Sequence, residues 1–233
     1  MAVPPATDQE FLREVDDELR RDKLTGVWSR HGRWIVIGVL AALALLGAYL
    51  FWRNQQENAA GREGEQLQSA YDALGAGSTA EAAGPLEALT KSSSEGNRAL
   101  ALFTQADVLL QRNDYKGAAA KFGAIVGDDG VAPPFRDLAL VRQTSAEYDT
   151  LAPQVVIDRL RPLAVPGNAY FGSAGEMVAT AYLRTGRRDL AGRMFGQIAR
   201  DGTVPATIRQ RAVQMAGLLG VDAVVQNEDQ KAR

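Results

Sequence analysis

The feature that most constrains this chain is an uninterrupted apolar run near its N-terminus. Nineteen uncharged residues, from Trp34 to Trp52, lie between two arginines. As a helix, this run would extend about 28 Å, close to the ~30 Å hydrocarbon core of a bilayer. Aromatic side chains near both of its ends favour the membrane interface. We therefore expect a transmembrane helix at residues 34–52, with five residues at the membrane interfaces: Arg33, Trp34, Tyr49, Trp52 and Arg53.

A cleaved signal peptide is the main alternative to a transmembrane helix. Its apolar region should run for about 7–15 residues behind a short basic leader. Here 33 residues precede the apolar run, and only the weak Asn58-Ala59-Ala60 stretch offers small residues after it. The sequence therefore favours an uncleaved anchor.

The distribution of cations predicts the direction in which the anchor crosses. Only Arg53 and Arg62 closely follow the run, whereas five cations closely precede it: Arg20, Arg21, Lys23, Arg30 and Arg33. The positive-inside rule then leaves the N-terminus in the cytoplasm and exports the rest of the chain. We expect a single-pass protein with an exported C-terminal domain; in a bacterium with two membranes, it would lie in the inner membrane with this domain in the periplasm. The four-residue spacing of Gly38 and Ala42 would also let two copies pack in the membrane, but spans rich in alanine, leucine and glycine are common, so chance explains this spacing better.

Residues 1–33 are expected to form a cytoplasmic amphipathic leader. Thr7 begins a capping box, and Phe11, Val15 and Leu19 recur every fourth residue of a helix predicted from about residue 8 to residue 23. This apolar stripe is too small for a core, so we expect it to contact a partner or the membrane surface. His31, the only histidine, is interpreted as an interfacial residue rather than a functional titrating group.

The remaining chain carries an internal repeat. Residues 106–125 align without gaps to residues 179–198, at an offset of 73 residues. In the second helix of each copy, a small, an aromatic and an aliphatic residue recur at the same spacing: Ala118, Phe122 and Ile125 in the first copy and Ala191, Phe195 and Ile198 in the second. This spacing resembles the tetratricopeptide pattern of 34-residue helical hairpins. In this alignment Asn113 corresponds to Gly186, and both residues tolerate the left-handed conformation that ends a helix. The expected repeat-packing residues are Ala106, Ala118, Phe122, Ile125, Ala179, Tyr182, Ala191, Phe195 and Ile198.

The repeats depart from the pattern in places. Leu102 in one copy and Gly175 in the other stand where an aromatic residue is expected, and Pro85 weakens one predicted helix. Helical hairpins are nevertheless expected throughout, at residues 63–74 with 79–89, 135–148 with 153–163, and in both aligned copies, with a last helix at 205–219.

The predicted fold class is therefore all-α, with one N-terminal transmembrane helix followed by a tetratricopeptide-like α-solenoid. The expected order is a leader (1–33), a transmembrane helix (34–52), a linker (53–62), a helical repeat domain (63–219) and a polar tail (220–233).

The residue content gives little support for catalysis. The chain has no cysteine, and its exported part has no histidine, which excludes thiolate chemistry, histidine triads and most transition-metal sites. We find no phosphate-binding GxxxxGK[ST] motif and no GxSxG motif. Asp128-Asp129 and Arg187-Arg188 are interpreted as solvated turns. We expect no enzyme activity, no cofactor and no metal, and the formal charge of −2 gives no nucleic-acid signature.

The order of these parts resembles the bacterial ancillary Sec-translocon subunit family (YfgM-like). The residues that carry the resemblance are 11–19, 28–34, the apolar run and the Ala118/Phe122 and Ala191/Phe195 pairs. The resemblance implies a protein-binding subunit beside a SecYEG-type translocon. Its implied partners are a periplasmic prolyl isomerase or chaperone and exported polypeptides. The alternative from another class is an envelope scaffold that organises cell-wall or division complexes through the same repeats.

Overall fold

The computed structural model describes residues 8–223, with side chains for residues 32–34, 36–58 and 61–223. The described residues form nine helices and no strand, so the all-α prediction is confirmed. The chain divides into two compact units, residues 1–61 and residues 62–233. We describe each unit by itself.

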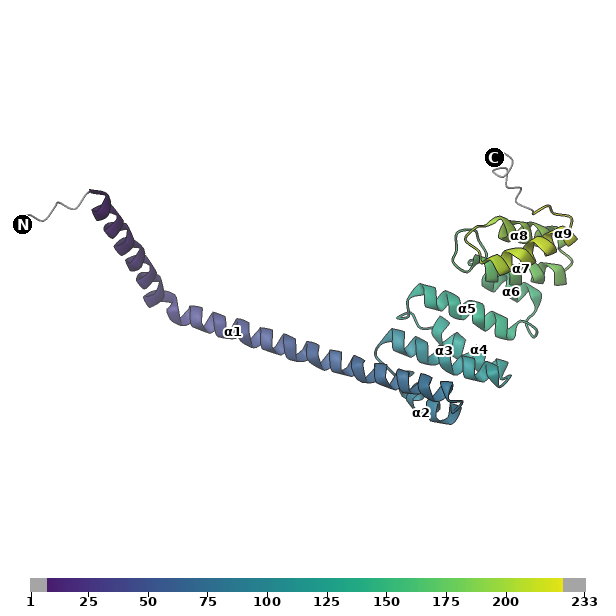
Figure 1. Cartoon of the computed structure of the whole chain (residues 1–233), viewed down its shortest axis with the longest axis horizontal. Coiled ribbons are helices and arrows are strands. Elements are labelled where there is room, and N and C mark those ends of the chain that lie inside the picture. Colours follow the sequence, from purple (N-terminus) through teal and green to yellow (C-terminus); the bar gives the residue numbers. More distant parts are fainter. Residues whose placement is uncertain (1–7, 224–233) are drawn as a thin grey trace, which may run out of the picture. The chain divides into compact units, whose positions relative to one another are not determined.

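Helix α1 (Asp8–Gly75) is one continuous helix that crosses the boundary between the units (Figure 1). The sequence predicts a separate leader helix ending near residue 23 and a linker at residues 53–62, but both segments lie inside α1. No proline occurs between residues 8 and 75, so no backbone N–H of the helical ladder is missing there. The side chains of residues 1–31, including the predicted leader stripe and His31, lie outside the described ones.

The apolar run forms a fully helical part of α1 in the first unit. This part is long and apolar enough to cross a membrane, with a mean hydropathy of 2.4 over 18 residues, none of which is buried. Leu45, for example, is 73% exposed. A core helix of a soluble protein would bury such side chains, so this helix is not part of a core among the described residues.

The second unit is a stack of helical hairpins, visible as successive helix pairs in Figure 1. The end of α1 pairs with α2, and three further pairs and a last helix follow: α2 (Thr79–Leu89), α3 (Glu95–Gln111), α4 (Tyr115–Val126), α5 (Pro133–Glu147), α6 (Pro153–Leu160), α7 (Phe171–Arg184), α8 (Arg188–Arg200) and α9 (Ala206–Leu218). Helix α9 packs on both α7 and α8. These helices lie where the sequence predicts them, and α2 continues through Pro85.

The first helix of a hairpin ends in the same way in both repeat copies. Asn113 has a φ of 59° and Gly186 a φ of 74°, which confirms the predicted left-handed ends. The N–H of Asp114 donates a hydrogen bond to the carbonyl oxygen of Leu109 at 2.9 Å. In the other copy, the N–H of Arg187 donates to the carbonyl oxygen of Tyr182, also at 2.9 Å. This is the Schellman arrangement, which satisfies the last carbonyls of a helix.

Each hairpin contributes a small core. The clusters centre on Leu86 and Leu89, then Phe122, then Leu160, and finally Phe195, all of which are almost fully buried. Burying one such side chain stabilises the folded state by about 1.5–3 kcal/mol. The helices therefore derive their stability mainly from packing on neighbouring hairpins, as in other repeat proteins.

Residues 219–223 follow α9 and pack back onto α8. Val221 lies against the last core cluster, and Ala223 is buried. Arg200 donates to the carbonyl oxygen of Asp222. The sequence predicts a polar tail from residue 220 onward. Its first residues are thus packed, and residues 224–233 lie outside the described part of the chain.

Candidate functional site

The predicted repeat-packing residues lie in the cores rather than on the surface. Ala106, Ala118, Phe122 and Ile125 belong to one cluster, and the equivalent Ala179, Ala191, Phe195 and Ile198 belong to another. Tyr182 is half-buried and packs against the two C-terminal clusters. In each copy the small residue lets the two helices approach, and the aromatic ring fills the space beyond. These residues build the scaffold, and a binding surface must lie elsewhere.

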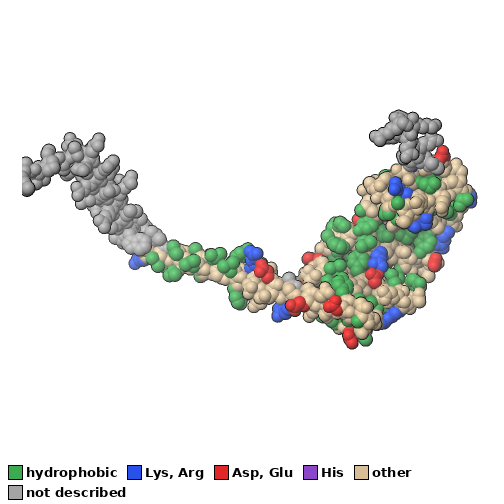
Figure 2. All heavy atoms as spheres, in the orientation of Figure 1, with side chains coloured by type: hydrophobic (Ala, Val, Ile, Leu, Met, Phe, Trp, Pro, Cys, Tyr) green, Lys and Arg blue, Asp and Glu red, His purple; other side chains and the backbone are tan. Residues whose placement is uncertain are grey.

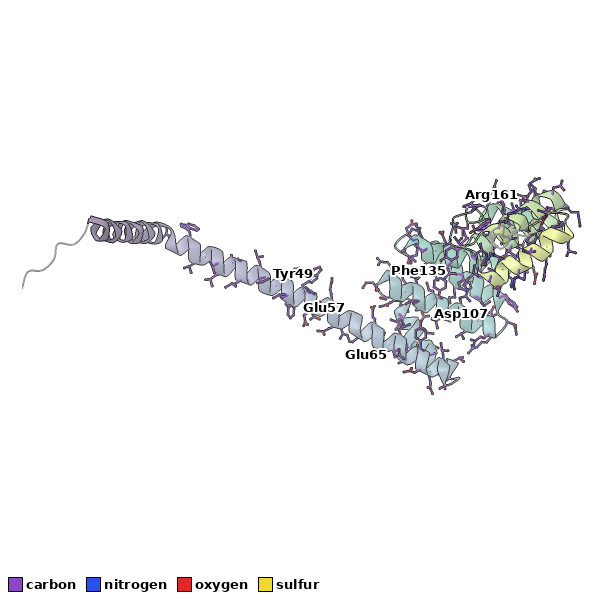
Figure 3. The ribbon with its side chains drawn as sticks, turned by 45° about the horizontal axis from the view of Figure 1, so that its top comes forward. Tyr49, Glu57, Glu65, Asp107, Phe135 and Arg161 are labelled. Carbon is purple, nitrogen blue, oxygen red and sulfur yellow. The ribbon has the colours of Figure 1, made fainter. Side chains whose placement is uncertain are left out.

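The predicted membrane-interface residues all lie on α1. The Arg33 guanidinium lies 5.9 Å from the centroid of the Trp34 ring. Tyr49 and Trp52 are exposed near the other end of the apolar run, and Tyr49 is labelled in Figure 3. Arg53 forms an ion pair with Glu57 at 2.8 Å. The described side chains therefore present an apolar surface with an aromatic residue and an arginine at each end.

A groove of about 560 Å³ opens between α1, α3 and α5 in the second unit. These are the first helices of three consecutive hairpins, so the groove lies on the surface that the first helices share. Apolar side chains dominate its lining: Tyr71, Leu74, Leu100, Phe103, Phe135 and Leu138. Figure 3 labels Asp107 on α3 and Phe135 on α5, two of the lining residues.

Several apolar side chains that line the groove are exposed to solvent rather than buried. Tyr71 is 41% exposed, Leu100 37% and Phe135 45%, although all three line the same hollow. In Figure 2, hydrophobic side chains of the second unit gather on the face in view, beside an adjacent basic and acidic side chain. Exposed apolar side chains that converge on one hollow are typical of a surface that binds another molecule.

One ion pair is built into the groove. Two N–H groups of Arg142 on α5 donate to the two carboxylate oxygens of Asp107 on α3. The Arg142 guanidinium also lies 4.9 Å from the centroid of the buried Phe122 ring. A bidentate pair stacked on a ring has little rotational freedom. The groove therefore offers a fixed polar feature between its apolar walls.

A second, shallower hollow lies between α5 and α7. Ser145, Asp149, Met177 and Thr180 are among the residues that line it. Glu176, on its rim, accepts two hydrogen bonds from Arg211 of α9, at 2.8 and 2.7 Å. The first helices of successive hairpins therefore carry two neighbouring hollows.

The two charged turns noted in the sequence have structural partners. Asp128 accepts from Arg98 at 2.7 Å and from the N–H of Gly130 at 3.0 Å, and the Arg98 contact is the main cause that lowers its pKa. Arg187 donates to the amide oxygen of Gln154 at 2.7 Å and lies over the Tyr182 ring. Neither turn is merely solvated, as the sequence had suggested. Each holds neighbouring elements together.

The groove residues were not predicted from the sequence. Repeat spacing identifies the core side of each helix, because both copies conserve the same pattern there. Leu100, Phe103 and Asp107 on α3 and Phe135, Leu138 and Arg142 on α5 also follow three- and four-residue spacing. That spacing would have shown that each set of residues lies on one face of its helix, but only the packed structure shows that these two faces meet.

Among the described residues, no cluster of acidic or histidine side chains is arranged to bind a metal.

Stacked helical hairpins with a groove along their first helices define an α-solenoid of the kind that binds other proteins. The tetratricopeptide repeat-like domain family matches residues 26–216 of the sequence. The chain therefore belongs to the tetratricopeptide repeat-like domain family. No curated protein and no solved structure matches the chain.

Proposed function

We propose that this protein is a membrane-anchored accessory subunit at the Sec translocon. In this role it binds exported polypeptides in the α1–α3–α5 groove and helps to pass them to periplasmic chaperones or a prolyl isomerase. The observation that supports binding most directly is the convergence of exposed Tyr71, Leu100 and Phe135 on one hollow. A groove of this kind accepts apolar side chains of an extended or helical segment.

The proposed position in the cell follows from the anchor. Residues 34–52 would cross the inner membrane, with the leader in the cytoplasm and the repeat domain, from about residue 63 to residue 219, in the periplasm. The matched family range begins at residue 26 and so includes the apolar run. An anchor beside a channel confines the groove to the channel exit, which raises its effective concentration toward emerging chains.

Site-specific photocrosslinking in living cells tests this function. We would place the crosslinking residue at Gln111, an exposed position in the groove, and at Gln197, an exposed position on α8, as the control. We expect Gln111 to yield adducts with translocon subunits, chaperones and exported polypeptides, and Gln197 to yield few.

Two results would contradict the proposal. Adducts with cell-wall or division proteins from Gln111 would support an envelope scaffold instead. Equal adducts from Gln111 and Gln197 would show that the groove is not the binding surface.

A further inference from the structure

A further hollow, of about 540 Å³, lies beside the α1–α3–α5 groove, between α2, α3 and α4. We call it the α2–α3–α4 hollow. Thr79 and Val108 line both the groove and this hollow, so the two share a rim. Along α3, the groove residues and the hollow residues occupy adjacent faces of the helix, and Val108 lies at their boundary. An extended segment that fills the groove therefore reaches the hollow by crossing a single rim.

The α2–α3–α4 hollow combines an apolar lining with two cations. Arg112, the C-cap of α3, donates to the hydroxyl oxygen of Thr79 at 2.5 Å, which holds its guanidinium beside the shared rim. Lys121 of α4 also lines the hollow and is half-buried. Neither cation forms an ion pair within the described part of the chain. The apolar lining comprises Ala80, Ala83, Leu86, Val108 and Leu109.

The one carboxylate among the described residues that line this hollow already has partners. It belongs to Glu87, which pairs with Lys91 at 3.5 Å and accepts from the Gln105 amide at 3.4 Å. The pKa of Glu87 is lowered first by the Gln105 hydrogen bond, then by Lys91, and last by the charge of Lys121. Lys121 is therefore only weakly compensated by this carboxylate.

The groove itself adds no uncompensated charge. Its described lining contains one carboxylate, that of Asp107, and one cation, Arg142, and these two form the bidentate pair. Glu81 of α2 and Asp114, the N-cap of α4, line neither the groove nor the α2–α3–α4 hollow. The described lining charges without an ion pair are thus the two cations of the hollow. An occupant that runs from the groove over the rim meets an apolar surface first and positive charge next.

We propose that the protein selects polypeptide segments in which an apolar stretch adjoins aspartate or glutamate, over the same stretch adjoining lysine or arginine. The apolar stretch occupies the groove, and the acidic side chains cross the rim to Arg112 and Lys121. This inference rests on the proposed function, since it names the class of polypeptide that the groove accepts. Charge complementarity of this kind determines the choice of partner more than the total affinity.

Two fluorescent peptides with the same apolar core would test the selection. One carries two glutamates at each end and the other two lysines, and both termini are blocked so that only side chains carry charge. Both are titrated against the full-length protein in nanodiscs of zwitterionic lipid. We expect the glutamate-flanked peptide to bind about tenfold more tightly, since each exposed charge contact changes affinity by a few-fold.

The salt concentration separates nearby charges from distant ones. Residues 62–149 contain thirteen acidic and eight basic residues, a formal charge of −5, which opposes the selection at long range. At 0.15 M salt the Debye length is about 8 Å, so the charges beside the bound peptide dominate. At 1 M salt it falls to about 3 Å, and the preference should largely disappear.

Three double variants locate the selecting charges. Arg112→Gln with Lys121→Gln removes both cations of the hollow and should lower the preference to about twofold or less. Arg112→Lys with Lys121→Arg keeps both charges and should keep most of the preference. The matched control, Arg188→Gln with Arg193→Gln, removes two exposed cations from α8 and should leave the preference unchanged. Circular dichroism of each variant verifies that it is folded.

A groove variant tests where the apolar core of the peptide lies. Leu100 lines the groove and is 37% exposed, so Leu100→Ser removes apolar contact without changing any charge. It should weaken the binding of both peptides to a similar extent and leave the preference intact. Unchanged binding of both peptides would contradict the placement of the core in the groove.

The possible results separate the two proposals. Equal binding of both peptides, or tighter binding of the lysine-flanked one, would overturn the selection but leave polypeptide binding intact. An equal loss of preference in the two glutamine variants, or its loss in the variant that keeps both charges, would show that the cations of the hollow do not carry the selection. Binding of neither peptide would overturn the proposed function and this inference with it.

Discussion

Gly175 stands where the repeat pattern places an aromatic residue, and its neighbours leave little room for a side chain. A Cβ atom at this position would lie 3.0 Å from Cδ1 of Ile198 and 3.4 Å from the sulfur of Met194. In the other copy, the corresponding Leu102 packs against the core of its hairpin. The two copies thus fill the same space in different ways: Ile198 and Met194 of α8 reach over Gly175 in one copy, whereas Leu102 itself packs on the core in the other.

Asn113 gives a prediction at this scale, because its φ of 59° is costly for most side chains. The left-handed conformation costs an ordinary residue roughly 1–2 kcal/mol, and glycine almost nothing. Asn113→Val should therefore lower the free energy of unfolding by about 1–2 kcal/mol. Asn113→Gly should change it little. Urea unfolding of the full chain in detergent, followed by circular dichroism, measures both, and equal stability of the two variants would contradict the argument.

Asp128 gives a prediction about pH. Its pKa in the folded protein is held below the ordinary value of 3.8, first by the Arg98 hydrogen bond. A lowered pKa contributes stability above the unfolded-state pKa, and this contribution is lost as the pH falls through the folded-state value. Asp128→Asn should therefore destabilise the protein at pH 7, and the deficit should shrink below about pH 3.8.

Unfolding in urea at pH 7 and pH 3 measures this difference. Asp129→Asn is the control, because the Asp129 side chain is 99% exposed despite its contact with Arg136. A deficit of Asp128→Asn that stayed constant between the two pH values would show that the carboxylate charge is not responsible.

At the scale of elements, α8 shows how the array ends. Its Gly192 and Gly196 face Val221, and a Cβ atom at Gly192 would lie 2.9 Å from Cγ2 of Val221. The segment after α9 thus occupies the surface on which a further hairpin would otherwise pack. Terminal elements of repeat proteins close the stack in this way.

Two glycine-to-alanine changes in different helices should have opposite effects. Gly64 is exposed inside α1 with no atom near its absent Cβ, so Gly64→Ala should stabilise the protein by roughly 0.5–1 kcal/mol through helix propensity. Gly192→Ala should destabilise it by about 1–3 kcal/mol, because the methyl group overpacks the contact with Val221. Thermal unfolding compares the two variants. A stabilising Gly192→Ala would mean that residues 219–223 are not closely packed on α8.

At the scale of the whole molecule, the apolar part of α1 and the hairpin stack obey different constraints. The stack buries its large apolar side chains in four clusters, whereas those of residues 36–52 remain exposed. Soluble proteins rarely expose a contiguous apolar surface of this size to water, because its hydration is unfavourable. A bilayer would cover it, with the aromatic residues at its edges.

Charges placed in the apolar run test the anchor. Leu43→Arg with Leu45→Arg should release the chain from membranes at alkaline pH, because each arginine at the centre of a span costs about 2.5–3.5 kcal/mol on the insertion scale. Leu218→Arg, at an exposed position on α9, is the control and should stay with the membrane fraction.

Protease added to spheroplasts then reports the direction of crossing. We expect cleavage of the repeat domain from outside. A wild-type chain in the soluble fraction, or a mature chain that begins beyond residue 58, would contradict the anchor.

Much of this architecture could be predicted from local patterns. Nineteen uncharged residues between Arg33 and Arg53 identify the apolar helix, because the length and polarity of a segment decide whether it suits a bilayer. The matched spacing of Ala118/Phe122 and Ala191/Phe195 predicts the hairpins and their cores. Helix ends at Asn113 and Gly186 follow from the backbone freedom of those residues.

The sequence by itself determined which segments of the hairpin stack are helical, where the hairpins turn and which side of each of those helices is buried, since these depend on contacts between residues close in the chain. It did not show that α1 continues through residues 53–62. Only the tertiary structure decided that Tyr71, Leu100 and Phe135 share one groove, and that Arg142 spans from α5 to Asp107 on α3. Those contacts join residues some 30 positions apart, and their geometry depends on how successive hairpins stack. No local pattern encodes that angle, because it results from all the side chains at each interface packing together.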